Sequence, residues 1–334
     1  MRIKHLVMAI AAAAVATFGV FYHLNGDKNP LKKEVAPPPK SVNISLTPVQ
    51  VQRLITPKLT SLDPAKILNV IVRGNHIYLT LRSDDNNSAS ITGLNLQNNI
   101  LTLRKDYGKN GVNKISGKMI LDITLDDKGT IYYTKNGVHA LSNGSDIISL
   151  EGKTSANKLL LLADNHSGYL YGNDNFDKVT IKDGSLDDMQ PSFLKNRALP
   201  FRGGLSQLVL GPSNTLYGGG RITPNGIYLI ASFDDKGKLL QKYGSEKNIV
   251  KSSIYNLTSF TVLKDYVCAI DGFTTKLWSK KGKYLGSINN DNLYSESIVP
   301  LKLVRLNDET ALVLTYTRNT KTELLDLAFF TLTF

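Results

Sequence analysis

From about Ser41 onward, the chain consists of short hydrophobic runs, some alternating with polar positions and some wholly apolar. Clusters of Gly, Asn, Asp and Ser separate these runs, and the apolar residues show no helical spacing. Short runs of this kind, bounded by turn-forming residues, are typical of β-strands. The pattern therefore predicts an all-β domain over residues 41–334.

One type of strand recurs along this domain at intervals of roughly 40 to 55 residues, which is the length of a propeller blade. Its six copies are Ile77–Leu79, Ile131–Tyr133, Tyr169–Tyr171, Thr215–Tyr217, Val267–Ala269 and Ala311–Val313. Each copy follows another apolar strand and a tight turn, and a third strand and often a fourth come after it. Short Gly- and Asn-rich links of this kind join hairpins. The repeat predicts a six-bladed β-propeller.

Two units depart from the four-strand pattern. The last unit ends the chain without a fourth strand, whereas Ser41–Ile55 precedes the first unit and belongs to no other blade. We expect this N-terminal strand to complete the last blade and close the ring, which removes exposed sheet edges. The third unit loses its pattern after its third strand. We interpret the irregular stretch Gly184–Gly204 as a candidate partner-binding loop, because long loops tend to be functional.

Three segments carry a family resemblance: LDDKGTIYYT at Leu125–Thr134, SFDDKGKLLQKYG at Ser232–Gly244 and WSKKGKYLGSI at Trp278–Ile288. They belong to a repeated pattern of a hydrophobic strand, a D-x-x-G turn, an I-Y strand and a strand that ends in D-D-K-G-K, which resembles the NHL-like and lactonase-like six-bladed propellers. The resemblance implies a fold and leaves the function open, because propellers host many activities.

The N-terminus predicts export. Arg2 and Lys4 precede an apolar run, Leu6–Leu24, that is about long enough to cross a bilayer. Residues 1–24 are therefore a signal anchor in the bacterial inner membrane or a signal peptide cleaved near Ala16. The linker at residues 25–40 contains three consecutive prolines and forms a semi-rigid stalk. A stalk favours the membrane anchor with a periplasmic propeller; a soluble periplasmic or secreted protein is the alternative.

The net charge restricts the classes of partner, and the cysteine count excludes an intrachain disulfide. The formal net charge of +12 favours polyanions. Export argues against nucleic acid, which leaves an envelope protein or an anionic envelope polymer. The single cysteine, Cys268, lies in an apolar run and cannot form an intrachain disulfide, so we expect a buried structural thiol.

Charged residues are predicted on one face of the propeller, around the central channel. The resemblance implies that ligands bind there, at the links between second and third strands and between blades. These links include Arg82–Ser88, Gly172–Lys178, Gly218–Asn225, Asp271–Lys276 and Thr317–Lys321. The candidate binding residues are Asp84, Asp85, Asp174, Asp177, Arg221, Asp271 and Arg318.

A calcium ion is the one cofactor that the sequence suggests. Asn173, Asp174, Asn175 and Asp177 form a dense oxygen cluster, although Lys178 excludes an EF-hand loop. Calcium-dependent lactonases with this build hold their ion through such oxygens. The remaining chain shows no lactonase motif and no catalytic constellation. We therefore predict a non-catalytic binding or scaffolding module; a calcium-dependent lactonase or esterase at the channel mouth is the alternative.

Overall fold

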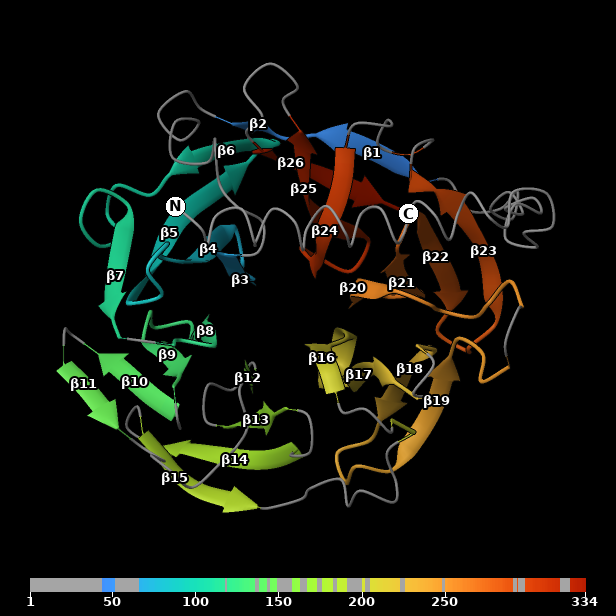
Figure 1. The fold of residues 1–334 in the computed structure, drawn as a ribbon, viewed down its shortest axis with the longest axis horizontal. Helices are drawn as coiled ribbons and strands as arrows, with labels where there is room; N and C mark the ends of the chain where they lie inside the picture. Colours follow the sequence, from blue (N-terminus) through green and yellow to red (C-terminus); the bar gives the residue numbers. More distant parts are fainter. Residues whose placement is uncertain are drawn as a thin grey trace, which may run out of the picture. The chain divides into compact units, whose positions relative to one another are not determined.

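The computed structural model describes residues 44–51, 66–117, 119–135, 138–142, 145–148, 158–162, 167–172, 176–182, 185–190, 200–201, 205–222, 226–247, 250–290, 293, 298–318 and 325–334. Six sheets surround a central axis, with antiparallel pairing between successive strands (Figure 1). The predicted all-β, six-bladed propeller is confirmed. The predicted helix at 1–24 and linker at 25–40 lie outside the described residues. Within the described ranges, no helix is long and apolar enough to span a membrane.

The first strand of each blade lies nearest the axis (Figure 1). The strands of blade 1 are β3 (Ile67–Arg73), β4 (His76–Arg82), β5 (Ser88–Gln97), β6 (Ile100–Leu103) and β7 (Val112–Ser116). Those of blade 2 are β8 (Asp122–Leu125), β9 (Ile131–Thr134), β10 (Val138–Ser142) and β11 (Ser145–Ile148). Those of blade 3 are β12 (Lys158–Leu161), β13 (Ser167–Tyr171), β14 (Phe176–Lys182) and β15 (Ser185–Gln190).

The second half of the ring repeats this order. Blade 4 contains β16 (Leu205–Leu210), a 3-10 turn at Pro212–Asn214, β17 (Leu216–Arg221), β18 (Tyr228–Phe233) and β19 (Leu239–Tyr243). Blade 5 contains β20 (Leu257–Val262), β21 (Tyr266–Asp271), β22 (Thr274–Ser279) and β23 (Tyr284–Asn289). Blade 6 contains β24 (Ile298–Arg305), β25 (Thr310–Arg318) and β26 (Leu325–Thr333).

The N-terminal strand lies beside the last blade. β1 (Ser45–Pro48) pairs antiparallel with β26, and β2 (Gln50–Val51) then pairs parallel with β6 of blade 1. One short segment thus contacts the last blade and the first. The predicted strand in Ser41–Ile55 is present, and its backbone hydrogen bonds go to both neighbours.

Two strands were not anticipated. The stretch interpreted as a loop from Gly184 begins with β15, which pairs with β14 as the outer strand of blade 3; the loop interpretation is wrong for Ser185–Gln190. Its sequence, SLDDMQ, is mostly polar, which is compatible with an outer strand and gave no hydrophobic run to recognise. In blade 1, β5 is long enough to pair with β6 near one end and with β7 near the other.

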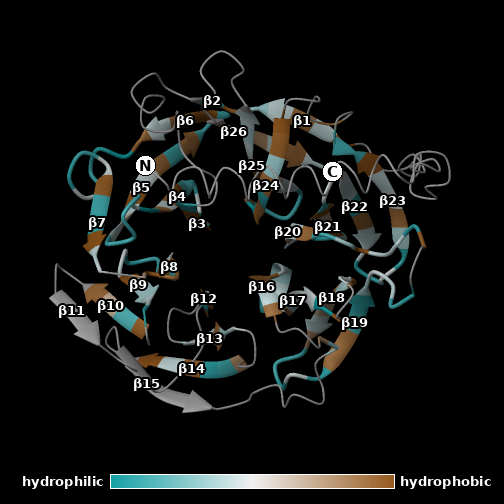
Figure 2. Ribbon diagram, viewed as in Figure 1, coloured by the Kyte–Doolittle hydropathy of each residue, from teal (hydrophilic) through white to brown (hydrophobic). Residues whose placement is uncertain are grey.

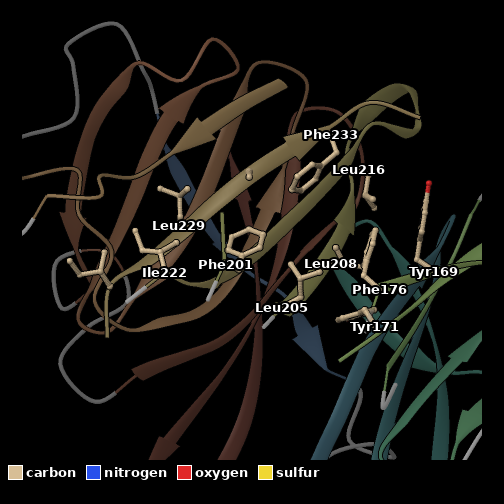
Figure 3. Close-up of a cluster of buried hydrophobic side chains, with 12 residues drawn as sticks. Tyr169, Tyr171, Phe176, Phe201, Leu205, Leu208, Leu216, Ile222, Leu229 and Phe233 are labelled. Atoms are coloured by element: carbon tan, nitrogen blue, oxygen red, sulfur yellow. The ribbon is translucent and has the colours of Figure 1, made fainter. Parts of the chain in front are cut away.

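The core is divided among the blade interfaces. The buried hydrophobic residues of the described part group into six clusters, one between each pair of neighbouring blades. Figure 3 shows the cluster between blades 3 and 4, where Tyr169, Tyr171 and Phe176 face Leu205 and Phe233. Hydrophobic segments recur in strands around the whole ring (Figure 2). The blades therefore stabilise one another by burying apolar faces that none could bury alone.

The single cysteine belongs to one of these clusters. Cys268 is fully buried between blades 5 and 6, and burial raises the pKa of its thiol to about 12. The predicted buried structural thiol is confirmed, because a thiol held in its protonated form in an apolar core is a weak nucleophile.

Candidate functional site

The strand order divides the connections between two faces. Links between first and second strands and between third and fourth strands lie on one face. Links between second and third strands lie on the opposite face, together with the links from blade to blade. We call this second face the channel face. It is the face on which the sequence placed its candidate residues.

Two of these candidates, Asp84 and Asp85, lie in the turn between β4 and β5. Asp85 accepts hydrogen bonds from Ser83 Oγ at 2.6 Å and from Asn87 N at 3.0 Å. These bonds, with that of Ser83 first, lower the pKa of the Asp85 carboxyl to about 2. Asp84 is exposed and forms an ion pair with Lys66. Asp85 thus stabilises its own turn, whereas Asp84 joins this turn to the residue that precedes β3.

Arg221 lies in a strand and not in the predicted loop Gly218–Asn225. It is the last residue of β17, and its Nη2 donates to Tyr228 Oη at 3.1 Å. The glycines before it are needed for packing: a Cβ at Gly219 would lie 2.7 Å from Phe260 Cε1, and one at Gly218 would lie 2.7 Å from Leu205 Cδ2. Glycine here permits close approach of side chains to the strand, and does not mark a loop.

The remaining candidates fall into two groups. Asp177 is buried on β14, whereas Asn173, Asp174 and Asn175 lie outside the described residues, as does the side chain of Arg318. In the described ranges, no group of three His, Cys, Asp or Glu residues is arranged to hold a metal. The calcium cluster stays a prediction. Among Asp84, Asp85, Arg221 and Asp271, no hydrogen bond or ion pair joins any two within the described part of the chain.

Asp271 belongs to a buried polar network in blade 5. Its Oδ2 lies 2.7 Å from Lys276 Nζ, and both side chains are more than nine-tenths buried. Its Oδ1 accepts hydrogen bonds from Tyr255 N at 2.9 Å and Asn256 N at 2.6 Å. Lys276 Nζ also donates to the backbone oxygen of Ser253. The carboxylate therefore joins the β21–β22 turn to the link that leads into blade 5.

Asn290 fixes the other side of the same turn. Its Nδ2 donates to Gly272 O at 2.9 Å, its N donates to Phe273 O at 2.8 Å, and its Oδ1 accepts from Thr275 Oγ1 at 2.7 Å. Gly272 has a φ of +56°, a conformation that favours glycine. The turn has only two residues between the strands, so the loop predicted at Asp271–Lys276 is mostly strand β22.

This rigid turn displays an aromatic residue. Phe273 is 71% exposed although the backbone around it is held by the bonds just described. Eight large hydrophobic residues of the described chain are exposed, and six of them lie on the channel face. These six are Met119, Leu121, Val250, Tyr255, Phe273 and Val299. Sequence reasoning missed them because it searched for charges; a Phe in a Gly-Phe turn was the signal available.

A second arrangement surrounds the axis. Each innermost strand has a polar residue immediately before a buried hydrophobic one, and we call this polar site the axial position. The six axial residues are Asn69, Asp122, Lys158, Gln207, Ser259 and Lys302. In four blades a β-bulge precedes the axial residue. A bulge re-aims the side chain that follows it.

Axial side chains bond to the next blade. Asn69 Nδ2 donates to Ile123 O at 3.3 Å, and Asp122 Oδ2 accepts from Leu159 N at 3.3 Å. Gln207 Nε2 donates to Phe260 O at 3.1 Å, and Gln207 Oε1 accepts from Phe260 N at 3.1 Å. Ser259 Oγ accepts from Leu303 N at 3.1 Å. In all four cases the partner is the residue after the axial position of the following blade. This side-chain ring ties neighbouring blades together where their ladders do not pair.

Three axial residues carry charge and interact across the axis. Burial raises the pKa of Asp122 to about 6, and Lys158 partly opposes this rise. Burial also lowers the pKa of Lys158, with Asp122 opposing it. The pKa of Lys302 is lowered by burial and by Lys158. Since β24 neighbours neither β8 nor β12 in the ring, the interaction of Lys302 with the other two passes through the axial region (Figure 1).

The raised pKa of Asp122 predicts a pH dependence of stability. Because the folded state binds this proton more tightly than the unfolded chain does, the protein gains stability as pH falls through about 6. The gain is complete once the pH reaches the ordinary pKa of an Asp carboxyl in the unfolded chain. Asp122→Asn cannot titrate. Relative to this variant, the wild type should gain about 2 to 3 kcal/mol between pH 8 and pH 4. Urea unfolding of both proteins across this range measures the difference, and a constant difference would contradict the prediction.

Comparison of the sequence with protein-family models and with curated proteins gives no match. Among solved structures, the chain is similar to the WD40 domain of Neurospora crassa Pan2, with a TM-score of 0.47, 9% identity and coverage of 80% of this chain and 88% of that one. It is also similar to a putative 6-phosphogluconolactonase from Bacteroides uniformis, with a TM-score of 0.41, 15% identity and coverage of 66% of this chain and 70% of that one. A third similar structure is KlHsv2 with loop 6CD replaced by a Gly-Ser linker, with a TM-score of 0.42, 10% identity and coverage of 79% of this chain and 97% of that one. Similarity at this level carries no conclusion about activity or ligands.

Proposed function

We propose that this protein is a non-catalytic binding module that docks a protein partner on its channel face. The observation that carries the proposal is Phe273, an exposed aromatic side chain on a turn whose backbone is fixed by a buried ion pair and by Asn290. Aromatic residues held in advance in their binding geometry contribute most to interface affinity, because little conformational entropy is lost on association.

The surroundings of Phe273 suit an interface centre. Tyr255 is exposed beside the same network, Val250 is exposed in the link that leads into blade 5, and Val299 is exposed near the start of β24 in blade 6. Exposed apolar groups gathered on one face of a soluble domain typically mark an interaction site. The charge of +12 on the chain favours a partner whose apolar contact is bordered by acidic residues, since opposite charges steer association.

The setting proposed for this module follows from the N-terminal sequence. An apolar segment at residues 6–24, preceded by Arg2 and Lys4 and followed by a Pro-rich stalk, supports an inner-membrane anchor that holds the propeller in the periplasm. The partner is then an envelope protein.

We also propose that the segment Ser45–Val51 closes the ring. Its support is the pairing of β1 with β26 and of β2 with β6, together with the burial of Val49 in the cluster between blades 6 and 1. Closure of this kind gives a rigid frame, on which exposed turns keep their relative positions.

Site-specific crosslinking tests the docking face. A photoreactive phenylalanine analogue at Phe273 in the full-length chain should give one discrete protein adduct in cells. The same analogue at Leu240, which is 55% exposed on the outer strand β19, should give none. With the partner identified by mass, Phe273→Ser should weaken its binding about tenfold to a hundredfold, as for an interface hot spot.

The controls separate binding from folding. Because the Phe273 side chain is largely exposed, Phe273→Ser should leave the urea midpoint of unfolding unchanged. Equal labelling at Phe273 and Leu240, or no adduct at either, would count against the docking face. An adduct with the mass of two copies would replace the proposed partner by self-association.

A further inference from the structure

The axial ring has one member that differs from the others. Five of the six axial side chains make a hydrogen bond to the following blade. These are the four described above and Lys158, whose Nζ donates to Ser206 O at 2.5 Å. The side chain of Lys302 makes no hydrogen bond or ion pair within the described part of the chain. Its half-buried position removes part of the water that would otherwise solvate its ammonium group. A desolvated cation without an acceptor is costly.

The charge around the axis is also unbalanced. The axial positions hold two lysines, Lys158 and Lys302, and a single carboxylate, Asp122, whereas the other three axial residues are neutral. One positive charge is therefore left over when all three groups are ionised. The Asp122 carboxylate already accepts from Leu159 N and from Asn69 Nδ2, each at 3.3 Å. These are long bonds, so the carboxylate retains capacity to accept a shorter one.

Lys302 occupies the axial position of blade 6, and Lys158 lowers the pKa of its ammonium group, as expected for two like charges that lack a counter-ion between them. A bound anion would turn this repulsion into two attractions and would supply the acceptor that Lys302 lacks. Both lysines are half-buried, so each keeps part of its surface in contact with solvent. Lysine ammonium groups bind carboxylates and phosphates as point charges, without the planar geometry that arginine requires.

We propose that Lys158 and Lys302 bind the oxyanion of a small ligand, a carboxylate or phosphate group, at the propeller axis, and that Asp122 accepts a hydrogen bond from a hydroxyl or amino group of the same ligand. This site is distinct from the Phe273 turn and does not depend on the docking function proposed above. The ligand class is a small hydroxy- or amino-substituted acid, or a phosphate ester.

Thermal unfolding of the full chain tests the proposal with two probes, inorganic phosphate and acetate. Each is compared with chloride at equal ionic strength and at pH 7. Phosphate also stabilises proteins non-specifically, so the measured quantity is the rise in melting temperature of the wild type minus that of Lys302→Met. A control variant, Lys281→Met, removes an exposed lysine in the β22–β23 turn.

At a probe concentration about ten times its Kd, the wild type and Lys281→Met should show a rise of about 3 °C beyond that of Lys302→Met. In chloride, Lys302→Met should melt at or above the wild-type temperature, because it removes a desolvated charge. A larger rise with phosphate than with acetate assigns the site to phosphate groups, and the reverse assigns it to carboxylates. Equal rises in all three proteins with both probes, or no rise with either, would overturn the proposal.

Discussion

Asp271→Ala is expected to lower the free energy of unfolding by about 3 to 5 kcal/mol, because it leaves the Lys276 ammonium group buried without its counter-ion. The carboxylate lies 2.7 Å from Lys276 Nζ and also satisfies two backbone N–H groups, those of Tyr255 and Asn256. The two N–H groups lose this acceptor, and the Lys276 ammonium group keeps only the neutral oxygen of Ser253. Removal of both charges, by Asp271→Ala combined with Lys276→Met, should restore part of the loss.

A matched surface pair provides the control for this prediction. Asp106 forms an ion pair of 2.7 Å with Arg104 but is largely exposed, so Asp106→Ala should change the free energy of unfolding far less than Asp271→Ala. Urea unfolding of the variants gives the comparison. If Asp271→Ala costs no more than Asp106→Ala, the buried network does not hold the blade 5 turn. Crosslinking from Phe273 should also decrease in Asp271→Ala, since the turn would lose its fixed geometry.

Val49→Asp is expected to destabilise the propeller by about 3 kcal/mol or more, because it places a carboxylate without a partner in an apolar cluster. Val49 is 7% exposed and packs among residues of blades 6 and 1. Its backbone N donates to Phe329 O at 2.9 Å. The substitution therefore weakens a segment that pairs with β26 of blade 6 and with β6 of blade 1.

The control for this second prediction lies four residues away. Ser45 is exposed on β1, so Ser45→Asp adds the same charge to the same segment without burying it and should cost less than about 0.5 kcal/mol. Denaturant unfolding and the rate of limited proteolysis measure both effects. Equal stability of Val49→Asp and Ser45→Asp would show that the ring does not need the N-terminal segment.

The blade pattern was predictable because it is local. Strands β4, β9, β13, β17, β21 and β25 contain the six recurrent motifs of the sequence, since alternation and turn residues act over a few neighbouring positions. Outer strands were harder to recognise. β7 forms by pairing with β5, and β15 forms by pairing with β14. Their own sequences are too polar to predict a strand.

The candidate site was predictable only in part. The sequence indicated which links share a face, and Asp271 does lie where β21 ends at that face. Its carboxylate, however, contacts Lys276 and the backbone at Tyr255, a segment from the preceding blade link. Packing between segments decides whether an acidic side chain in a loop faces solvent or a buried cation. A local sequence pattern does not predict this packing.

The axial ring illustrates the same limit. Each polar residue is visible in the sequence beside an apolar run, but its partner belongs to another blade, and a bulge before Asn69, Gln207, Ser259 and Lys302 shifts the register. The sequence by itself determined the class of fold and the number of blades, because strand and turn preferences are local. Only the tertiary structure decided which polar groups are satisfied, which lysine lacks an acceptor and which aromatic side chain is displayed, because these depend on contacts between blades far apart in the chain.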